Sequence, residues 1–204
     1  MLPQELNKHL GNIDIYLLDL ILKGRVAVDD SILDAGCGEG RNIVYFLHNS
    51  YNVFGVDINP TAVKLVQMLS RSLQKGYDTN RFSCCDVSQM PFQDKQFGLV
   101  ISGAVLHFAK DVDHFFAMLD EMYRVLALDG NLFIRMASVF GMESQIESVD
   151  EYKYLLPDGS TRFLLTPELR AEIDQRYNFR YQEPLKTAIV ENTRSMTTLV
   201  LQKV

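Results

Sequence analysis

The sequence Ser31-Ile32-Leu33-Asp34-Ala35-Gly36-Cys37-Gly38-Glu39-Gly40-Arg41-Asn42 decides the fold of this 204-residue chain. A short apolar run ends there in three glycines at alternate positions, and a helix-like pattern begins at Asn42. The stretch therefore predicts a strand, a tight loop and a helix N-terminus. Glycine reaches positive φ and has no Cβ, so such a loop can bring its backbone N–H groups against a small molecule. We interpret the loop as a cofactor site.

Spacing and charge indicate which cofactor the loop binds. A dinucleotide fingerprint reads G-x-G-x-x-G and receives a pyrophosphate at a helix N-terminus. Here the spacing is G-x-G-x-G, and Arg41 stands where the third glycine would fall. The acidic side chains around the loop, which would repel a pyrophosphate and attract a sulfonium and an ammonium, are Asp34, Glu39, Asp57 and Asp86. We therefore expect S-adenosylmethionine rather than a dinucleotide.

Four segments, in this order, resemble the motifs of the class I, Rossmann-like S-adenosylmethionine-dependent methyltransferases. They are Ile32–Asn42, Val53–Asp57, Cys85–Val87 with Met90–Phe92, and Phe97–Leu106. The Gly40-Arg41-Asn42 ending and the stretch Phe163–Leu169 further resemble the small bacterial tellurite-resistance type branch. The resemblance implies methyl transfer to a small-molecule acceptor, such as a thiol or a metalloid oxyanion, with S-adenosylhomocysteine as the product.

Two acids have expected roles in holding the cofactor. Asp57 ends the second predicted strand, where two carboxylate oxygens suit both ribose hydroxyls; the alternative is a solvated strand-end acid. By the resemblance, Asp86 and the Val87 backbone read the adenine edge. Tyr16 either touches the cofactor or is a half-buried core tyrosine. The residues expected to contact the cofactor are Asp34, Gly36, Cys37, Gly38, Arg41, Asn42, Asp57, Ile58, Asp86, Val87, Ser102 and Tyr16.

His107 is the candidate catalytic residue, because it follows the fourth predicted strand at the same pocket mouth. It acts either as a general base or in orienting the substrate; the alternative is a pocket-wall histidine bonded to backbone. An anionic nucleophile such as a thiolate needs no base. His107 and His114 lack a Cys, Asp or Glu at a supporting spacing, so we predict no metal site.

Alternating strand and helix patterns predict an α/β fold. We expect a three-layer, doubly wound, mostly parallel seven-stranded sheet with the last strand antiparallel, plus a small β-hairpin insertion. The chain reads as one domain, with an N-terminal helical cap (1–30), a cofactor-binding core (31–138), an insertion with the hairpin (139–166), and a C-terminal helix with two final strands (167–204).

Local patterns place the individual elements. The expected helices span 4–23, 60–75, 111–128 and 167–176, and the expected strands span 31–35, 51–56, 81–85, 97–102, 131–137, 179–190 and 195–202. Strands at 152–156 and 162–165 flank the turn 157–160 as a hairpin. The segment 138–150 has no period and forms either a lid over the acceptor pocket or a plain surface connection.

Composition excludes several function classes. The net charge of -6 and the lack of a basic run argue against nucleic acid as a partner. Three cysteines without a disulfide pattern favour a reducing, cytoplasmic location, and no stretch reads as a signal peptide or membrane span. The oligomeric state is left open. Two alternatives remain beside the methyltransferase: a non-catalytic S-adenosylmethionine-binding regulatory protein and an NAD-dependent oxidoreductase.

Overall fold

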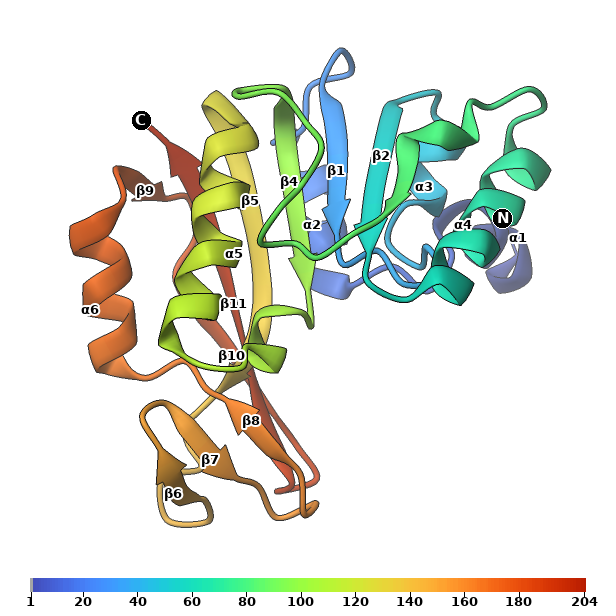
Figure 1. Cartoon of the computed structure of the whole chain (residues 1–204). Coiled ribbons are helices and arrows are strands. Elements are labelled where there is room, and N and C mark those ends of the chain that lie inside the picture. The colour runs from blue at the N-terminus through green and yellow to red at the C-terminus, as the bar shows by residue number, and fades with distance from the viewer. Residues whose placement is uncertain (1) are drawn as a thin grey trace.

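A twisted, mostly parallel sheet runs through the computed structural model, which describes residues 2–204 (Figure 1). Its strands are β1 (Ser31–Ala35), β2 (Asn52–Asp57), β3 (Phe82–Cys84), β4 (Phe97–Gly103), β5 (Leu126–Ser138), β9 (Phe179–Tyr181), β10 (Lys186–Val190) and β11 (Arg194–Lys203). The order along the sheet is β3-β2-β1-β4-β5-β11-β10, and β9 also pairs with β11. The first five strands are parallel, whereas β11 is antiparallel to β5. The α/β sheet with an antiparallel last strand is thereby confirmed.

Helices cover both faces of this sheet and give three layers. Leu17, Phe46 and Val66 pack α2 (Ile15–Leu22), α3 (Val44–His48) and α4 (Pro60–Leu73) onto one face. Phe115 and Leu169 pack α5 (Val112–Val125) and α6 (Pro167–Arg176) onto the other, which faces the viewer in Figure 1. The outlying α1 (Pro3–Leu10) buries no side chain. None of the helices described in residues 2–204 is both long and apolar enough to cross a membrane.

The chain changes direction across the sheet at β1. It proceeds outward from β1 through β2 to β3, then returns to β4 on the other side of β1. The carboxyl ends of β1 and β4 are therefore a topological switch point, where open α/β sheets bind their ligands. Those ends point toward the bottom of the view in Figure 1.

Helix starts follow the capping residues in the sequence. Asn59 caps α4 by accepting the Thr61 N–H, and Thr166 caps α6 by accepting the Leu169 N–H. Each cap is followed by a proline at the first helical position, where the missing N–H has no intrahelical role. Both helix starts agree with the sequence pattern.

A separate small sheet stands at the same end of the molecule as the switch point (Figure 1). It consists of β6 (Glu147–Asp150), β7 (Lys153–Leu155) and β8 (Thr161–Phe163), all antiparallel. The expected hairpin is β7 with β8. Its third strand, β6, lies in the segment 138–150. All four residues of β6 are exposed, so the sequence there shows no alternation of apolar and polar residues.

Several predicted boundaries are wrong. The helix expected over 4–23 is two helices, because Gly11 adopts a φ of 62° and Asp14 caps a new start. The helix expected to reach 128 ends at Val125, since Leu126 already pairs with Phe97 as the start of β5. The strand expected over 179–190 is two strands, separated around Pro184, so three strands follow α6.

Candidate active site

A cavity of about 340 Å³ lies at the carboxyl ends of β1, β2 and β4. Its walls come from the loops after β1, β2, β3 and β4, from the short helix η2 (Leu106–Phe108), and from α5. The lining residues are Gly36, Asp57, Ile58, Asp86, Val87, Ala104, Val105, Phe108, Lys110, His114 and Met118. The structure thus brings the expected Gly36, Asp57, Ile58, Asp86 and Val87 together around one space.

The glycine loop is tied to the end of β2. The N–H groups of Gly36 and Cys37 both donate to the Val56 carbonyl oxygen at 2.8 Å. Gly36 has a φ of +85°, and a Cβ there would lie 2.3 Å from Val105 Cγ2. Only glycine fits this close approach. Cys37 is buried, which raises the pKa of its thiol, so the side chain serves as neutral packing.

Asp57 orients its carboxylate with two backbone bonds. Gly38 N–H donates to Oδ2 and Asn59 N–H donates to Oδ1, each at 2.8 Å. Each carboxylate oxygen can accept more than one hydrogen bond, so the group can still receive hydroxyl donors from the cavity. The ribose contact stays a prediction.

Asp34 is a buried acid with an unmatched oxygen. It is 1% exposed, and its Oδ2 has no hydrogen-bond partner within residues 2–204. Burial raises the pKa of Asp34 to about 7, the Arg41 charge opposes that rise and the Asp57 charge adds to it. Unmatched buried polar atoms are costly, so this position fits a cationic or hydrogen-bond-donating ligand group.

Two further unmatched atoms lie on neighbouring strands at the same edge. Ser102 Oγ, near the end of β4, and Arg135 Nε, on β5, have no partner among the residues described. Arg135 pairs in register with Gly103, the residue after Ser102. With Asp34 on the adjacent β1, these atoms make three unmatched buried polar groups near this edge of the sheet, although none of the three residues lines the cavity itself.

Asp86 is fixed by donors from its own loop and from α5. Its Oδ1 accepts from Ser88 N–H at 2.9 Å, from Ser88 Oγ at 2.8 Å and from His114 Nε2 at 3.4 Å. Burial raises the pKa of Asp86, but the bonds from Ser88 and His114 outweigh it and hold that pKa below its usual value. The adenine contact stays a prediction. Sequence reasoning missed the role of His114, although the Asp111 cap places it in the first turn of α5.

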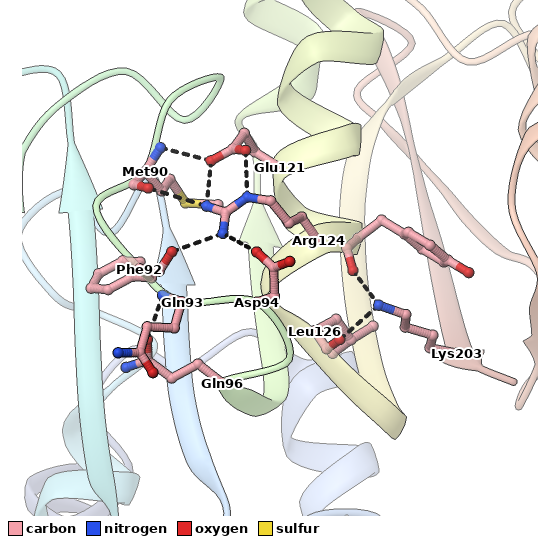
Figure 2. A network of polar contacts seen from close by, with 10 residues as sticks. Met90, Phe92, Gln93, Asp94, Gln96, Glu121, Arg124, Leu126 and Lys203 are labelled. Atoms are coloured by element: carbon pink, nitrogen blue, oxygen red, sulfur yellow. Dashed lines mark hydrogen bonds and ion pairs between the residues drawn. The ribbon is translucent and has the colours of Figure 1, made fainter.

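The loop that follows Asp86 is clamped to α5 (Figure 2). Arg124 Nη1 donates to the Phe92 carbonyl oxygen and to Asp94 Oδ1, both at 2.8 Å. Glu121 holds the same guanidinium at 2.7 and 2.8 Å and accepts the Met90 N–H at 2.9 Å. The loop that carries Met90, Phe92 and Asp94 is therefore supported by α5.

Lys203 binds the C-terminal end of α5 (Figure 2). Its buried ammonium donates to the carbonyl oxygens of Tyr123 at 2.6 Å and Leu126 at 2.9 Å, where a cation is favoured by the helix dipole. The last strand is thereby fastened to α5.

Arg41 and Asn42 contact the start of α2, the helix on which Tyr16 lies. Asn42 Oδ1 accepts the Asp14 N–H at 3.1 Å, and the buried Asp14 carboxylate pairs with Arg135 and lies 3.6 Å from Arg41 Nη2. The Tyr16 ring lies 5.6 Å from the cations of both Arg135 and Lys186. None of the three lines the cavity, so their cofactor contacts stay predictions. No sequence signal indicated the Asp14 pair with Arg135.

His107 is bonded to backbone. Its Nδ1 accepts the Ala137 N–H at 3.2 Å, so the neutral ring carries its proton on Nε2. Burial, with the charges of Arg162 and Arg194, lowers the pKa of His107 to about 4. The bond fits the backbone-bonded alternative, but His107 is not among the residues that line the cavity, and both its wall role and its general-base role stay predictions. Within the part of the chain that the structure describes, no three His, Cys, Asp or Glu side chains are grouped to hold a metal ion.

Comparisons with known proteins fit this geometry. Residues 33–134 match the family model described as a methyltransferase domain. The 2-heptyl-1-hydroxyquinolin-4(1H)-one methyltransferase of Mycobacteroides abscessus is 32% identical over 98 residues, which cover 48% of this chain and 41% of that protein. A SAM-dependent methyltransferase from Methanosarcina mazei has a similar structure, with a TM-score of 0.74 at 21% identity over 90% of this chain and 97% of that one. The Burkholderia thailandensis 1,6-didemethyltoxoflavin-N1-methyltransferase, solved with bound 1,6-didemethyltoxoflavin and S-adenosylhomocysteine, has a TM-score of 0.68 at 18% identity over 98% and 82% of the two chains.

The extent of these matches decides what they establish. The chain spans about half the length of the curated relatives it matches, 41% and 46% for the first two. The solved structures, at low identity, establish the fold. The family model covers half of the chain, from β1 into β5, and so includes the glycine loop, Asp34, Asp57, Asp86 and Ser102. The chain belongs to the methyltransferase domain family.

Proposed function

We propose that this chain transfers the methyl group of S-adenosylmethionine to a small-molecule acceptor. The observation that carries the proposal is the cavity at the strand ends, which Asp57 and Asp86 line, beside a strand whose Asp34 carboxyl group is buried and unmatched. A cavity lined by two acids, with a third acid buried on the neighbouring β1, favours a cationic ligand over a pyrophosphate. The cofactor carries both a sulfonium and an ammonium.

The residues of the cavity fit this cofactor in three parts. Asp57, oriented by Gly38 and Asn59, would accept from the ribose hydroxyls. Asp86 would accept from the adenine amino group, with the Val87 N–H donating to a ring nitrogen. Asp34 lies beneath the glycine loop, where its negative charge would favour the cationic methionine end.

Placement is the main chemical task of the protein. When bound, S-adenosylmethionine supplies an activated methyl group that a nucleophile can take with its own electron pair. Rigid walls hold the reacting groups in line, and orientation of this kind can lower a barrier by roughly 7 to 11 kcal/mol. The clamp on the Met90–Asp94 loop and the fastened α5 provide that rigidity.

The acceptor class rests on the relatives and on the sequence. The Mycobacteroides and Burkholderia proteins are named for small heteroaromatic substrates. The tellurite-resistance resemblance adds metalloid oxyanions, and a thiol needs the least assistance from the protein. We therefore propose a small nucleophile among these classes, with no nucleic acid partner and a cytoplasmic location.

Ligand binding and turnover together test the proposal. S-adenosylmethionine and S-adenosylhomocysteine should stabilise the protein, by about 2.7 kcal/mol at 100 times the dissociation constant, and NAD should not. A panel of thiols, amines, hydroxyl compounds and metalloid oxyanions should then yield S-adenosylhomocysteine. Equal stabilisation by NAD would contradict the cofactor assignment. Tight binding without turnover by any acceptor would favour the regulatory alternative.

A further inference from the structure

Arg162 of the small sheet lies over the wall of the cofactor cavity. Its guanidinium carbon is 4.9 Å from the centroid of the Phe108 ring, and Phe108 lines the cavity. The His107 ring is 4.5 Å from that of Phe108. The position of Arg162 follows from the fold, because β8 lies against η2. Arg162 and His107 therefore both lie against one aromatic side chain that lines the cavity.

Both residues offer hydrogen-bond donors. Ala137 N–H occupies the Nδ1 lone pair of His107, which leaves Nε2–H as its free polar group. Arg162 gives one Nη1 bond to the Thr161 carbonyl oxygen at 2.9 Å, and a guanidinium carries five N–H donors in total. Arg162 and His107 therefore offer hydrogen-bond donors beside a cavity that is lined by the carboxylates of Asp57 and Asp86.

In the described part of the chain, Arg162 and Arg194 form no ion pair, although the carboxylate of Asp158 lies near both. Across residues 2–204, no carboxylate lies within 4 Å of a charged nitrogen of Arg162, or of Arg194 at the start of β11. Asp158 lies close enough for both arginines to lower its pKa, after the larger effect of Ser160. Its Oδ1 is occupied by the Ser160 N–H at 2.9 Å and by the Ser160 hydroxyl. Two unpaired cations in a chain of net charge -6 mark a local preference for an anion.

We propose that the methyl acceptor carries a carboxylate, which Arg162 and the Nε2–H of His107 bind at the mouth of the site, with Arg194 adding long-range attraction. A guanidinium presents paired donors that match a carboxylate, and charge-assisted bonds of this kind are strong and directional. The carboxylate would anchor the acceptor at one end while the nucleophilic group reaches toward the cofactor. Arg162 is then a specificity residue contributed by the small sheet. This inference rests on the proposed methyl transfer.

Matched probes separate charge from shape. The probe pairs are 4-hydroxybenzoate with 4-hydroxybenzamide, and 3-mercaptopropionate with 3-mercaptopropionamide. Each pair keeps the nucleophile and changes only the charge. Binding is measured by calorimetry on protein saturated with S-adenosylhomocysteine. We expect each carboxylate to bind about tenfold or more tightly than its amide, as for loss of one charge-assisted contact.

Two arginine variants test the assignment. Arg162→Gln should reduce the preference for the carboxylate to less than about twofold, and Arg162→Lys should retain part of it. Arg180→Gln, at an exposed arginine on β9, should leave the preference unchanged. A preference that survives in Arg162→Gln overturns the proposal, as does equal binding of carboxylate and amide, or no binding of either carboxylate.

S-adenosylhomocysteine affinity is measured first on every variant, to separate this proposal from the proposed function. Wild-type protein that fails to bind the nucleoside contradicts the proposed function itself. Normal nucleoside binding without a carboxylate preference contradicts only the acceptor class. Unchanged nucleoside affinity in Arg162→Gln also shows that the variant is folded.

Discussion

Gly38 donates its backbone N–H to Asp57 Oδ2 at 2.8 Å, so the glycine loop and the acid at the end of β2 form one unit. Two consequences follow for Asp57. Its carboxylate is aimed before any ligand arrives, because Asn59 fixes the second oxygen. Its removal also leaves the Gly38 N–H without this acceptor, while the bonds of Gly36 and Cys37 to the Val56 carbonyl oxygen remain.

Asp57→Ala should weaken cofactor binding. Loss of a hydrogen-bonding charged partner costs roughly 1.5 to 3 kcal/mol, which corresponds to a drop of about one to two orders of magnitude in affinity. Asp57→Asn should lose less, because one side-chain oxygen remains to accept a hydrogen bond. Calorimetry with S-adenosylhomocysteine measures both variants. An Asp57→Ala affinity within twofold of wild type would leave only the solvated strand-end acid.

Asp34 should make cofactor binding depend on pH. Its folded pKa is raised from 3.8 to about 7, so below pH 7 the carboxyl is largely protonated and offers no charge to a cationic ligand. Affinity for S-adenosylmethionine should therefore rise as pH increases from about 6 to 8. In Asp34→Asn this rise should be absent. A wild-type affinity that is flat over this range would show that Asp34 does not face the cationic groups.

The raised pKa of Asp34 also makes the free energy of unfolding depend on pH. Between pH 3.8 and about 7 the folded chain holds the Asp34 proton while the unfolded chain has lost it, so the free energy of unfolding falls as pH rises. His107, whose folded pKa is lowered from 6.5 to about 4, gives the opposite slope between those values. Asp34→Asn retains His107, and the difference between variant and wild type in denaturant titrations isolates the Asp34 effect.

His107→Ala distinguishes a donor from a base. With its proton on Nε2, the neutral ring can donate a hydrogen bond but cannot remove a proton there. We expect the kcat of the variant to fall less than about tenfold and its pH–rate profile to keep its shape, since the acceptor sets the pKa. A loss of 100-fold or more, together with disappearance of a histidine-like rise in rate with pH, would establish the general base.

Gly36→Ala should disturb the cavity in two ways, through the positive φ of the backbone and through steric overlap of the new Cβ. Its φ is +85°, and the new Cβ would lie 2.3 Å from Val105 Cγ2. Gly76 is the matched control, with a φ of +81° and open space around a Cβ. A left-handed alanine costs roughly 1 to 2 kcal/mol at either site. Only Gly36→Ala should also displace Val105 and weaken S-adenosylhomocysteine binding; equal losses of stability and of affinity in both variants would contradict the tight fit.

Arg124→Ala should loosen the loop that follows Asp86. The guanidinium contacts the Met90 and Phe92 carbonyls, Asp94 and Glu121, and we expect a loss of roughly 1.5 to 3 kcal/mol of stability. The exposed pair of Arg176 with Asp120 is the control, and Arg176→Ala should cost at most about 1 kcal/mol. Hydrogen exchange of the 86–94 loop should rise only in Arg124→Ala. Protection that stays at the wild-type level there would mean that the loop is held by other contacts.

The sequence alone predicts those features of the fold and the site that depend on local sequence patterns. Asp34, Asp57 and Asp86 each stand at or just after a strand, and parallel strands bring their carboxyl ends to one edge, so their grouping could be expected. Asp14 and Arg135 are 121 positions apart, and their pairing depends on how α2 docks across the sheet. Leu126 continues a helical pattern, yet its pairing with Phe97 makes it a strand residue. Tertiary contact overrides local preference there.

The anchoring of α2 has a consequence for how the molecule is made. Its partners Arg135 and Lys186 leave the ribosome more than a hundred residues after Asp14 and Asp19. The glycine loop and the acids Asp34, Asp57 and Asp86 are therefore synthesised while α2 can already contact Arg41 and Asn42 but still lacks Arg135 and Lys186. Synthesis from the N-terminus makes the strand ends around the cavity early, and α2 completes its contacts across the sheet only when β5 and β10 have formed.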